Sequence, residues 1–235
     1  MRVLLRLLTG LLVLAICLVG LWKLSGSRSF QLFGGLVTRV ETTAPVVALT
    51  FDDGPTPQGT DSILSILSQS GVRATFFLTG TELERHPEAG RQILKAGHEV
   101  GNHSYSHRRM VLRSPAFIRQ EVERTDSLIR DLGYTGPIAF RPPYGKRLFL
   151  LPRYLHQQQR PTLLWDIEPE SDPEIAGSAE RIAEDVLKRV RPGSIILLHV
   201  MYPSRAESRR AVPMIIEGLQ AQGFRFVTIS ELLAA

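Results

Sequence analysis

Two adjacent carboxylates, Asp52 and Asp53, follow a short apolar run and precede a glycine and a proline. Neighbouring side chains at the end of a strand point in different directions, so one carboxylate can bind a metal ion while the other accepts a proton. Asp, Gly and Pro are also frequent in turns, where the same residues have only a structural role. The pair alone is therefore equally compatible with a catalytic site and with an ordinary turn.

A second candidate group contains His103 and His107, two of only six histidines in the chain. Side chains four residues apart lie on the same face of a helical turn, and such a pair can chelate one ion. One carboxylate and two imidazoles are the three protein ligands expected of a catalytic zinc with an open position for water. An exposed histidine pair without any ligand is the alternative that the spacing leaves open.

Further polar side chains follow other apolar runs of the chain. They are Arg141 and Tyr144, then Asp166 and Glu168, then His199. In a parallel α/β barrel the active site forms at the carboxyl ends of the strands, so we expect these groups to share one rim with the two aspartates. Taken singly, an arginine such as Arg141 is more often a structural ion-pair partner, and a histidine such as His199 at the end of an apolar run is more often a core residue.

The elements that must position these groups alternate between strand and helix from residue 45 onward. Seven short apolar or β-branched runs are predicted as strands, and they begin near Val46, Ala74, His98, Ile138, Thr162, Ser194 and Phe224. Between them, apolar residues at helical spacing predict helices, for example over residues 60–70 and 115–132. The alternation favours an α/β fold with a TIM-like (β/α) barrel of seven or eight parallel strands over a doubly wound open sheet.

The composition excludes several classes of protein. With 43% hydrophobic and 22% charged residues, the chain is neither disordered nor collagen-like nor a simple coiled coil. A single cysteine, Cys17, excludes an intramolecular disulfide framework and a cysteine-based zinc cluster. Residues 1–28 hold four of the 28 basic residues and no acidic one, so the remainder carries 24 basic against 23 acidic side chains. Because this part lacks the clustered cations of a nucleic-acid groove, we expect no nucleic-acid partner.

The N-terminal segment, residues 1–24, is predicted to be a signal anchor or a signal peptide. Arg2 and Arg6 precede an uncharged apolar run over residues 7–22. As a helix this run would span roughly 24 Å, slightly less than the roughly 30 Å hydrocarbon core of a membrane. The arginines predict a cytoplasmic N-terminus with the rest of the chain exported, and we expect an anchor rather than a cleaved signal. Residues 25–44 are expected to form a linker.

Four motifs occur in the order found in polysaccharide deacetylases of the NodB-homology type, carbohydrate esterase family 4. They are TFDDGP at 50–55, HSYSH at 103–107, RPPYG at 141–145 and leucine-x-histidine at 197–199. The chain resembles this family over about residues 44–235, so we expect a catalytic domain over 45–235. The resemblance implies a distorted (β/α) barrel, a divalent metal ion, usually zinc, and hydrolysis of N-acetyl groups on N-acetylglucosamine-type polysaccharide or oligosaccharide.

The motif match also implies a role for individual residues. The implied metal ligands are Asp53, His103 and His107. Asp52 would be the general base and His199 the general acid. Arg141 would orient the base, the backbone N–H of Tyr144 would help to hold the oxyanion, and Leu197 would line the pocket for the acetyl methyl group.

One segment departs from the family pattern. Family members commonly carry an Asp-x-x-Asp-Trp-like segment after the fifth strand, and its first Asp supports the acid histidine. This chain instead has Trp-Asp-Ile-Glu-Pro-Glu-Ser-Asp-Pro over residues 165–173. Strand alternation places Asp166 and Glu168 on one side, so either could hold His199, and Glu168 is the nearest match to the family's first Asp.

Two alternatives stand beside a metal-dependent deacetylase. The altered segment suggests a non-catalytic, envelope-anchored glycan-binding protein, and the same metal and base would also serve an esterase that removes O-acetyl groups from a xylan-type glycan. Zinc is preferred for one Asp and two His, although cobalt, nickel and iron are compatible with these ligands. The expected partners are an acetylated glycan and the membrane, through residues 7–22. We expect the chain in the cell envelope, anchored to the inner or cytoplasmic membrane with its catalytic domain outside.

Overall fold

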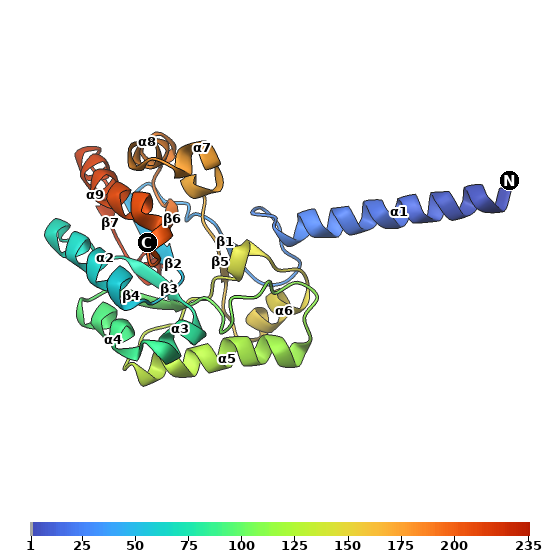
Figure 1. The fold of residues 1–235 in the computed structure, drawn as a ribbon, viewed down its shortest axis with the longest axis horizontal. Helices are drawn as coiled ribbons and strands as arrows, with labels where there is room; N and C mark the ends of the chain where they lie inside the picture. Colours follow the sequence, from blue (N-terminus) through green and yellow to red (C-terminus); the bar gives the residue numbers. More distant parts are fainter. Residues whose placement is uncertain (1) are drawn as a thin grey trace.

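The apolar N-terminal segment forms a long helix that projects from the rest of the chain (Figure 1). A computed structural model describes residues 2–235, and in it α1 spans Arg2–Ser25. The side chains of residues 2–23 are exposed. By length and composition α1 could cross a membrane, and a signal sequence has the same properties.

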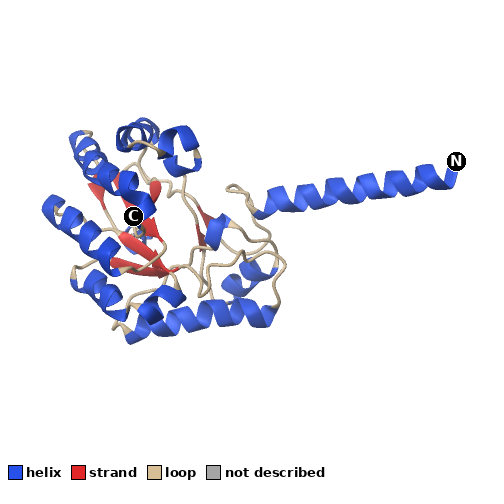
Figure 2. Cartoon of the chain, in the orientation of Figure 1, coloured by secondary structure: helices blue, strands red, loops and turns tan. Residues whose placement is uncertain are grey.

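Parallel strands form the centre of the α/β body, and helices surround them (Figure 2). The main sheet has the order β4-β3-β2-β6, and β7 pairs with the beginning of β2. Its strands are β2 (Val46–Asp52), β3 (Thr75–Leu78), β4 (Glu99–Asn102), β6 (Ile195–His199) and β7 (Arg225–Phe226). In the register of this sheet, Asp52 lies opposite Phe77 on one side and opposite His199 on the other. The carboxyl ends of β2 and β6 therefore meet at one edge.

The remaining strands are short. β1 (Leu36–Val37) and β5 (Thr162–Leu163) form a two-residue parallel pair, and single bridges link Phe140 to both Asn102 and Thr162. This pairing does not confirm a closed barrel of seven or eight strands. Prolines bound the strands predicted near residues 138 and 162: the first lies between Pro137 and Pro142, and the second follows Pro161. Because proline lacks the N–H that a sheet ladder needs, these residues limit the pairing there.

Helices cover the sheet, and the helices predicted over residues 60–70 and 115–132 are present, the second ending one residue earlier, at Asp131. Thr56 accepts a hydrogen bond from the Gly59 N–H at the start of α2, and Ser114 accepts one from the Phe117 N–H at the start of α5. The α-helices after α1 are α2 (Pro57–Ser70), α3 (Gly80–Arg85), α4 (Pro87–Lys95), α5 (Pro115–Asp131), α6 (Leu150–Gln157), α7 (Pro173–Ala176), α8 (Ala179–Arg189), α9 (Ala206–Ala221) and α10 (Ile229–Leu233). Three single-turn 3₁₀ helices are η1 (Pro143–Gly145), η2 (Pro169–Ser171) and η3 (Pro203–Arg205).

The hydrophobic core lies on both faces of β2, which is buried along its whole length. Val47, Leu49 and Phe51 pack into the larger apolar cluster, which includes side chains of α2, α8 and α9. Val46 and Ala48 pack into a second cluster on the other face. A strand buried on both faces is a rigid support for the residue at its end.

Residues 25–44, expected to be a linker, pack against the body. They contain β1, and the Val40 N–H donates to the carbonyl of Gly193. Ser25 is fully buried. The chain that leaves α1 is thus held to the body over much of this segment.

Candidate active site

Asp52 and Asp53 lie where β2 ends, and both line one cavity of about 550 Å³. The backbone at Asp53 adopts a left-handed conformation, with φ of 75°, and its N–H donates to the carbonyl of Phe77 on β3. This turn directs the chain away from the strand direction at the rim of the sheet. The two carboxylates therefore share a cavity and both face His103 Nε2, but only Asp52 is paired with an arginine, Arg141.

Asp53, His103 and His107 form a cluster with the dimensions of a metal site. The Asp53 Oδ1 atom lies 3.2 Å from His107 Nε2 and 3.9 Å from His103 Nε2. One potential ligand atom from each residue lies within 4.8 Å of the others. Tetrahedral zinc with bonds of about 2.0–2.2 Å separates its ligand atoms by roughly 3.4 Å. The separations of these atoms therefore fit one such ion.

The protonation of His103 also fits this role. Its Nδ1 atom lies 2.8 Å from the carbonyl oxygen of Arg141. A carbonyl oxygen only accepts, so Nδ1 donates to it, and Nε2 is the ring nitrogen that faces the two carboxylates, 3.5 Å from Asp52 Oδ2 and 3.9 Å from Asp53 Oδ1. Burial and the neighbouring His103 lower the pKa of His107, although Asp53 raises it, and this favours the neutral imidazole that binds a metal.

His103 and His107 lie on an irregular loop and not on a helical turn. The expectation that they share one face of a helical turn is therefore wrong. Residues 103–107 follow β4, and both Ser104 and His107 have positive φ angles. The ring centroids of the two histidines are nevertheless 5.0 Å apart. The side chain of Asn102 holds the first bend, because its Oδ1 accepts a hydrogen bond from the Ser104 N–H.

Glu121, which sequence reasoning did not select, fixes the rest of this loop. One oxygen of this buried carboxylate on α5 accepts the backbone N–H groups of Tyr105 and Ser106, at 3.1 and 2.8 Å. The other accepts the hydroxyl of Ser106, at 2.7 Å. The available signal was a carboxylate on the apolar face of a predicted helix, next to Ile118, Val122 and Thr125.

Asp52 is buried and ion-paired. Its Oδ1 accepts a hydrogen bond of 2.7 Å from Arg141, which also donates to Thr50 Oγ1 and to the carbonyl of Leu164. Burial raises the pKa of Asp52, but the positive charge of Arg141 and the neighbouring His103 and His199 lower it by a larger amount. The pKa of Asp52 is therefore below its usual range. Asp52 is therefore held as a carboxylate at neutral pH.

His199, at the end of β6, has a carboxylate partner in Glu170 on η2. Its Nδ1 lies 2.6 Å from Glu170 Oε2, and the same oxygen accepts the backbone N–H of His199. The other Glu170 oxygen accepts the hydroxyl of Ser208. Burial lowers the pKa of His199, but Glu170 outweighs it and raises the pKa to about 9.

The expectation that Asp166 or Glu168 holds His199 is wrong. Asp166 accepts hydrogen bonds from Ser194 Oγ and the Ile195 N–H, and Glu168 accepts from Trp165 Nε1 and pairs with Arg28. The alternation of side chains along the strand ends before Pro169, because η2 begins there. This turn places Glu170, and not Glu168, beside His199. The proline between the two glutamates was the signal for this change of direction.

Tyr144 and Leu197 line the same cavity. Tyr144 lies on η1 with a φ angle of 59°, and its ring packs 4.8 Å from that of His107. Leu197 is buried on β6, opposite Thr50 of β2. Gly26 and Arg28, from the segment after α1, also line the cavity, and sequence reasoning did not select them.

Comparisons with known proteins agree on one relationship. Residues 39–159 match the family model described as polysaccharide deacetylase. The chain is 33% identical over 200 residues to a peptidoglycan-N-acetylglucosamine deacetylase of Bacillus cereus, and the match covers 85% of this chain and 93% of that protein. It is 34% identical over 193 residues to the peptidoglycan-N-acetylmuramic acid deacetylase PdaC of Bacillus subtilis, covering 82% of this chain but only 40% of PdaC. A solved structure of the Bc1960 peptidoglycan N-acetylglucosamine deacetylase matches with a TM-score of 0.78 and 33% identity, covering 83% of this chain and 91% of that one.

Proposed function

The chain belongs to the polysaccharide deacetylase family, carbohydrate esterase family 4, and we propose that it is a metal-dependent hydrolase that removes N-acetyl groups from N-acetylglucosamine-type glycans. One observation carries this proposal: a buried, ion-paired carboxylate, Asp52, lies beside the cluster of Asp53, His103 and His107 in a single cavity.

Asp53, His103 and His107 would hold a divalent metal ion, and one carboxylate with two imidazoles favours zinc. When bound, such an ion would polarise the amide carbonyl and lower the pKa of a water molecule to about 7. Asp52 accepts the proton of the attacking water, and a base in this position typically contributes about 10²–10⁴-fold to the rate. Arg141 keeps this carboxylate ionised and oriented.

His199 supplies the proton that the departing amine needs. Glu170 raises the pKa of His199 and fixes the ring through Nδ1, so that Nε2 is the proton donor. The bond between the acyl carbon and the nitrogen breaks, the amine stays on the sugar with the proton from His199, and acetate is the other product. The Tyr144 N–H would assist the oxyanion, and Leu197 would contact the acetyl methyl group.

Residues 7–22 of α1 would anchor the chain in the inner or cytoplasmic membrane, with the catalytic domain over 45–235 outside. The exposed apolar surface of α1 and the arginines at its start support this placement. Recovery of the full-length chain in the membrane fraction after an alkaline wash is the expected result. A shortened chain released into the medium would contradict the anchor.

Glu170 weakens the case for a non-catalytic glycan-binding protein. That alternative rested on the altered segment over 165–173, which nevertheless provides His199 with a carboxylate. An O-acetyl esterase would use the same residues, so only a comparison of substrates separates it from an N-deacetylase.

The direct test measures acetate released by the full-length chain in detergent. Its substrates are N-acetylglucosamine oligosaccharides, peptidoglycan and acetylated xylan, each with added zinc and with a chelator. We expect chelator-sensitive release from the N-acetylated substrates. Release from xylan alone would favour the esterase, and no acetate from any substrate with zinc-loaded protein would overturn the proposal.

A further inference from the structure

A buried arginine, Arg147, makes several of the hydrogen bonds that hold the chain leaving α1 to the catalytic body. Arg147 is only 1% exposed, and its backbone N–H donates to the carbonyl of Ser25 at 2.8 Å. Its guanidinium donates to the carbonyls of Ser27 and Phe30, at 2.6 and 3.3 Å. It also donates to the side chain of Gln31 at 3.1 Å. The C-terminal end of α1 therefore has a defined position on the body.

The same segment forms part of the cavity wall. Gly26, one residue after α1 ends, lines the cavity, as does Arg28. The Arg28 guanidinium pairs with Glu168 at 2.8 Å and lies 5.1 Å from the centre of the Trp165 ring. If α1 crosses a membrane, as we propose above, the cavity begins where the chain leaves that membrane.

Cations gather at this junction. Lys146 Nζ lies 3.4 Å from the carbonyl oxygen of Trp22 and 4.3 Å from its ring centre. Arg109 lies 4.3 Å from the ring centre of Tyr144. Burial, together with the charges of Arg109, Lys23 and Arg147, lowers the pKa of Lys146. Lys146 and Arg109 contact the Trp22 and Tyr144 rings and the Trp22 carbonyl. Because none of these partners is an anion, the positive charges of the two side chains are available to one.

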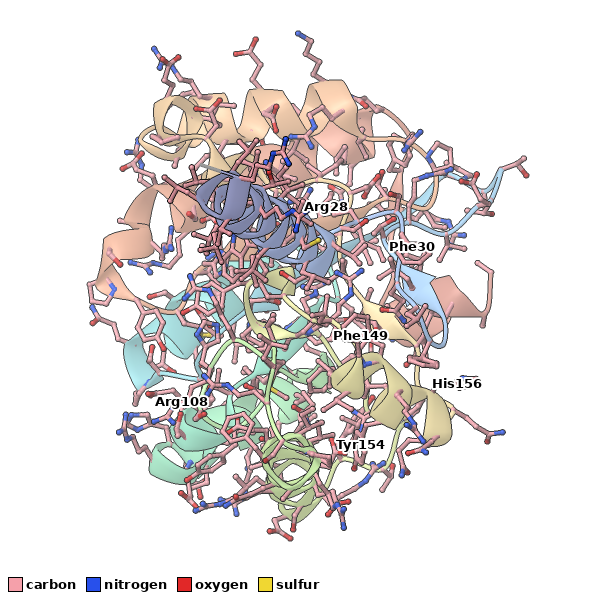
Figure 3. The ribbon with its side chains drawn as sticks, turned by 90° about the vertical axis from the view of Figure 1, so that its right-hand side faces the viewer. Arg28, Phe30, Arg108, Phe149, Tyr154 and His156 are labelled. Atoms are coloured by element: carbon pink, nitrogen blue, oxygen red, sulfur yellow. The ribbon has the colours of Figure 1, made fainter. Side chains whose placement is uncertain are left out.

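Exposed aromatic and aliphatic side chains lie on the face from which α1 projects. Figure 3 looks onto this face and labels Arg28, Phe30 and Phe149 on it. Phe30 and Phe149 are 51% and 38% exposed, and their near neighbours Leu32 and Leu150 are exposed as well. Exposed rings next to cations are typical of a surface that rests in the headgroup region of a membrane. We call this surface, defined by Lys23, Phe30, Lys146 and Phe149, the junction face.

We propose that the catalytic cavity opens at the membrane surface and acts on acetylated sugars held there by a phosphate-linked lipid, with Lys146, Lys23 and Arg109 facing the phosphate. This inference rests on the proposed function and specifies its substrate class. The geometry supports it because Lys146 belongs to both the junction face and the cavity lining, and contacts Trp22 near the end of α1. A phosphate at the membrane surface would lie beside the cavity rim, where Lys23, Arg109 and Lys146 have no carboxylate partner among the described residues and can stabilise an anion.

The test compares three substrates that carry the same N-acetylglucosamine. The full-length chain is placed in phosphatidylcholine vesicles and loaded with zinc. The sugar is supplied on decaprenyl phosphate, on a neutral dialkylglycerol in the same vesicles, or as a soluble neutral oligosaccharide. We expect kcat/KM for the phosphate-linked lipid to exceed that for each of the others by about tenfold or more, as expected for charge-assisted contacts.

Lys146→Gln isolates the contribution of charge. We expect it to lower kcat/KM for the phosphate-linked lipid by about tenfold, through KM, and to affect the neutral lipid less. Lys188→Gln, at an exposed lysine of α8, is the matched control and should change neither value. An equal loss of kcat/KM on both lipids in Lys146→Gln would overturn the proposed phosphate contact.

Two further results would overturn the proposal. The first is turnover of the soluble oligosaccharide as fast as that of the phosphate-linked lipid, which leaves the deacetylase function standing. The second is equally fast turnover of the neutral lipid in phosphatidylglycerol vesicles, which assigns the phosphate to the bilayer and not to the substrate. Acetate from none of the substrates would overturn both this inference and the proposed function.

Discussion

Asp52 and Asp53 are neighbours in sequence, yet their surroundings differ. The side chain of Asp52 is nearly inaccessible and bonded to Arg141, whereas that of Asp53 is partly exposed and faces two histidine nitrogens. Two carboxylates with different environments can take different chemical roles. At the scale of the residue, we therefore propose that Asp52 transfers the proton and that Asp53 binds the metal.

A test at this scale concerns the pH dependence set by Glu170. In the proposed mechanism the protonated form of His199 is the acid, and Glu170 raises its pKa to about 9, so we expect activity to be retained until pH rises through that value. Glu170→Gln removes the negative charge and lowers the pKa of His199. We therefore expect the alkaline limb of the kcat profile to move to lower pH by about 1 unit or more.

Glu174→Gln, at an exposed carboxylate of the neighbouring α7, is the control and should leave the profile in place. Zinc content should be the same in both variants, because neither residue belongs to the Asp–His–His cluster. An unshifted alkaline limb in Glu170→Gln would show that His199 does not act as the acid through this pair.

At the scale of the element, α5 positions a loop that belongs to a different strand. Glu121 on this helix holds the Tyr105–Ser106 backbone between the two histidines. Supports of this kind typically change metal affinity by about 10–100-fold when they are removed. We expect Glu121→Ala to weaken zinc binding by a factor in this range, while kcat at saturating zinc changes less.

Zinc affinity can be measured by competition with a chromogenic chelator, with Gln120→Ala on the exposed side of α5 as the control. Unchanged zinc affinity in Glu121→Ala would mean that the loop keeps its shape without the carboxylate. An equal loss in the control would point to a general effect on the helix.

Sequence patterns predicted the ends of the strands better than their pairing. Asp52, Asn102 and His199 are the last residues of β2, β4 and β6, as expected from apolar runs that end in polar residues. Barrel closure was not predictable in this way, because it depends on hydrogen bonds that residues near Phe140 and Thr162 make only as single bridges.

Sequence periodicity also did not predict contacts between residues that are distant in sequence. Glu121 reaches the histidine loop from another element, and Glu170 lies past a proline where alternation stops. The docking of the chain after α1 depends on Arg147, more than 100 residues away, and no local pattern marks it. The candidate site was thus predictable where motifs supply the residues, and unpredictable where tertiary contacts support them.

At the scale of the whole molecule, stability should depend on one buried histidine. His98 accepts the Ala74 N–H through Nδ1, and burial, with Arg73, lowers its pKa to about 4. An unfolded chain protonates histidine near pH 6.5, so between these values the unfolded state binds a proton that the native state does not. The free energy of unfolding should therefore fall by up to about 3 kcal/mol as pH decreases from 6.5 to 4.

His98→Asn keeps an acceptor for the Ala74 N–H but does not titrate, so it should reduce this dependence. Urea unfolding of the full-length chain in detergent, followed by tryptophan fluorescence across this pH range, measures the slope. His156→Asn, at an exposed histidine of α6, should retain the slope of the unsubstituted chain. A slope in His98→Asn as steep as that of the control would contradict the assignment to His98.

The division of roles between the two aspartates is tested most directly by measuring zinc affinity and acetate release in Asp52→Asn and Asp53→Asn. We expect Asp52→Asn to bind zinc with nearly unchanged affinity but to lose about 10²-fold or more of its turnover. We expect Asp53→Asn to lose zinc affinity and turnover together. Retained turnover in Asp52→Asn, or retained zinc affinity in Asp53→Asn, would contradict this division of roles.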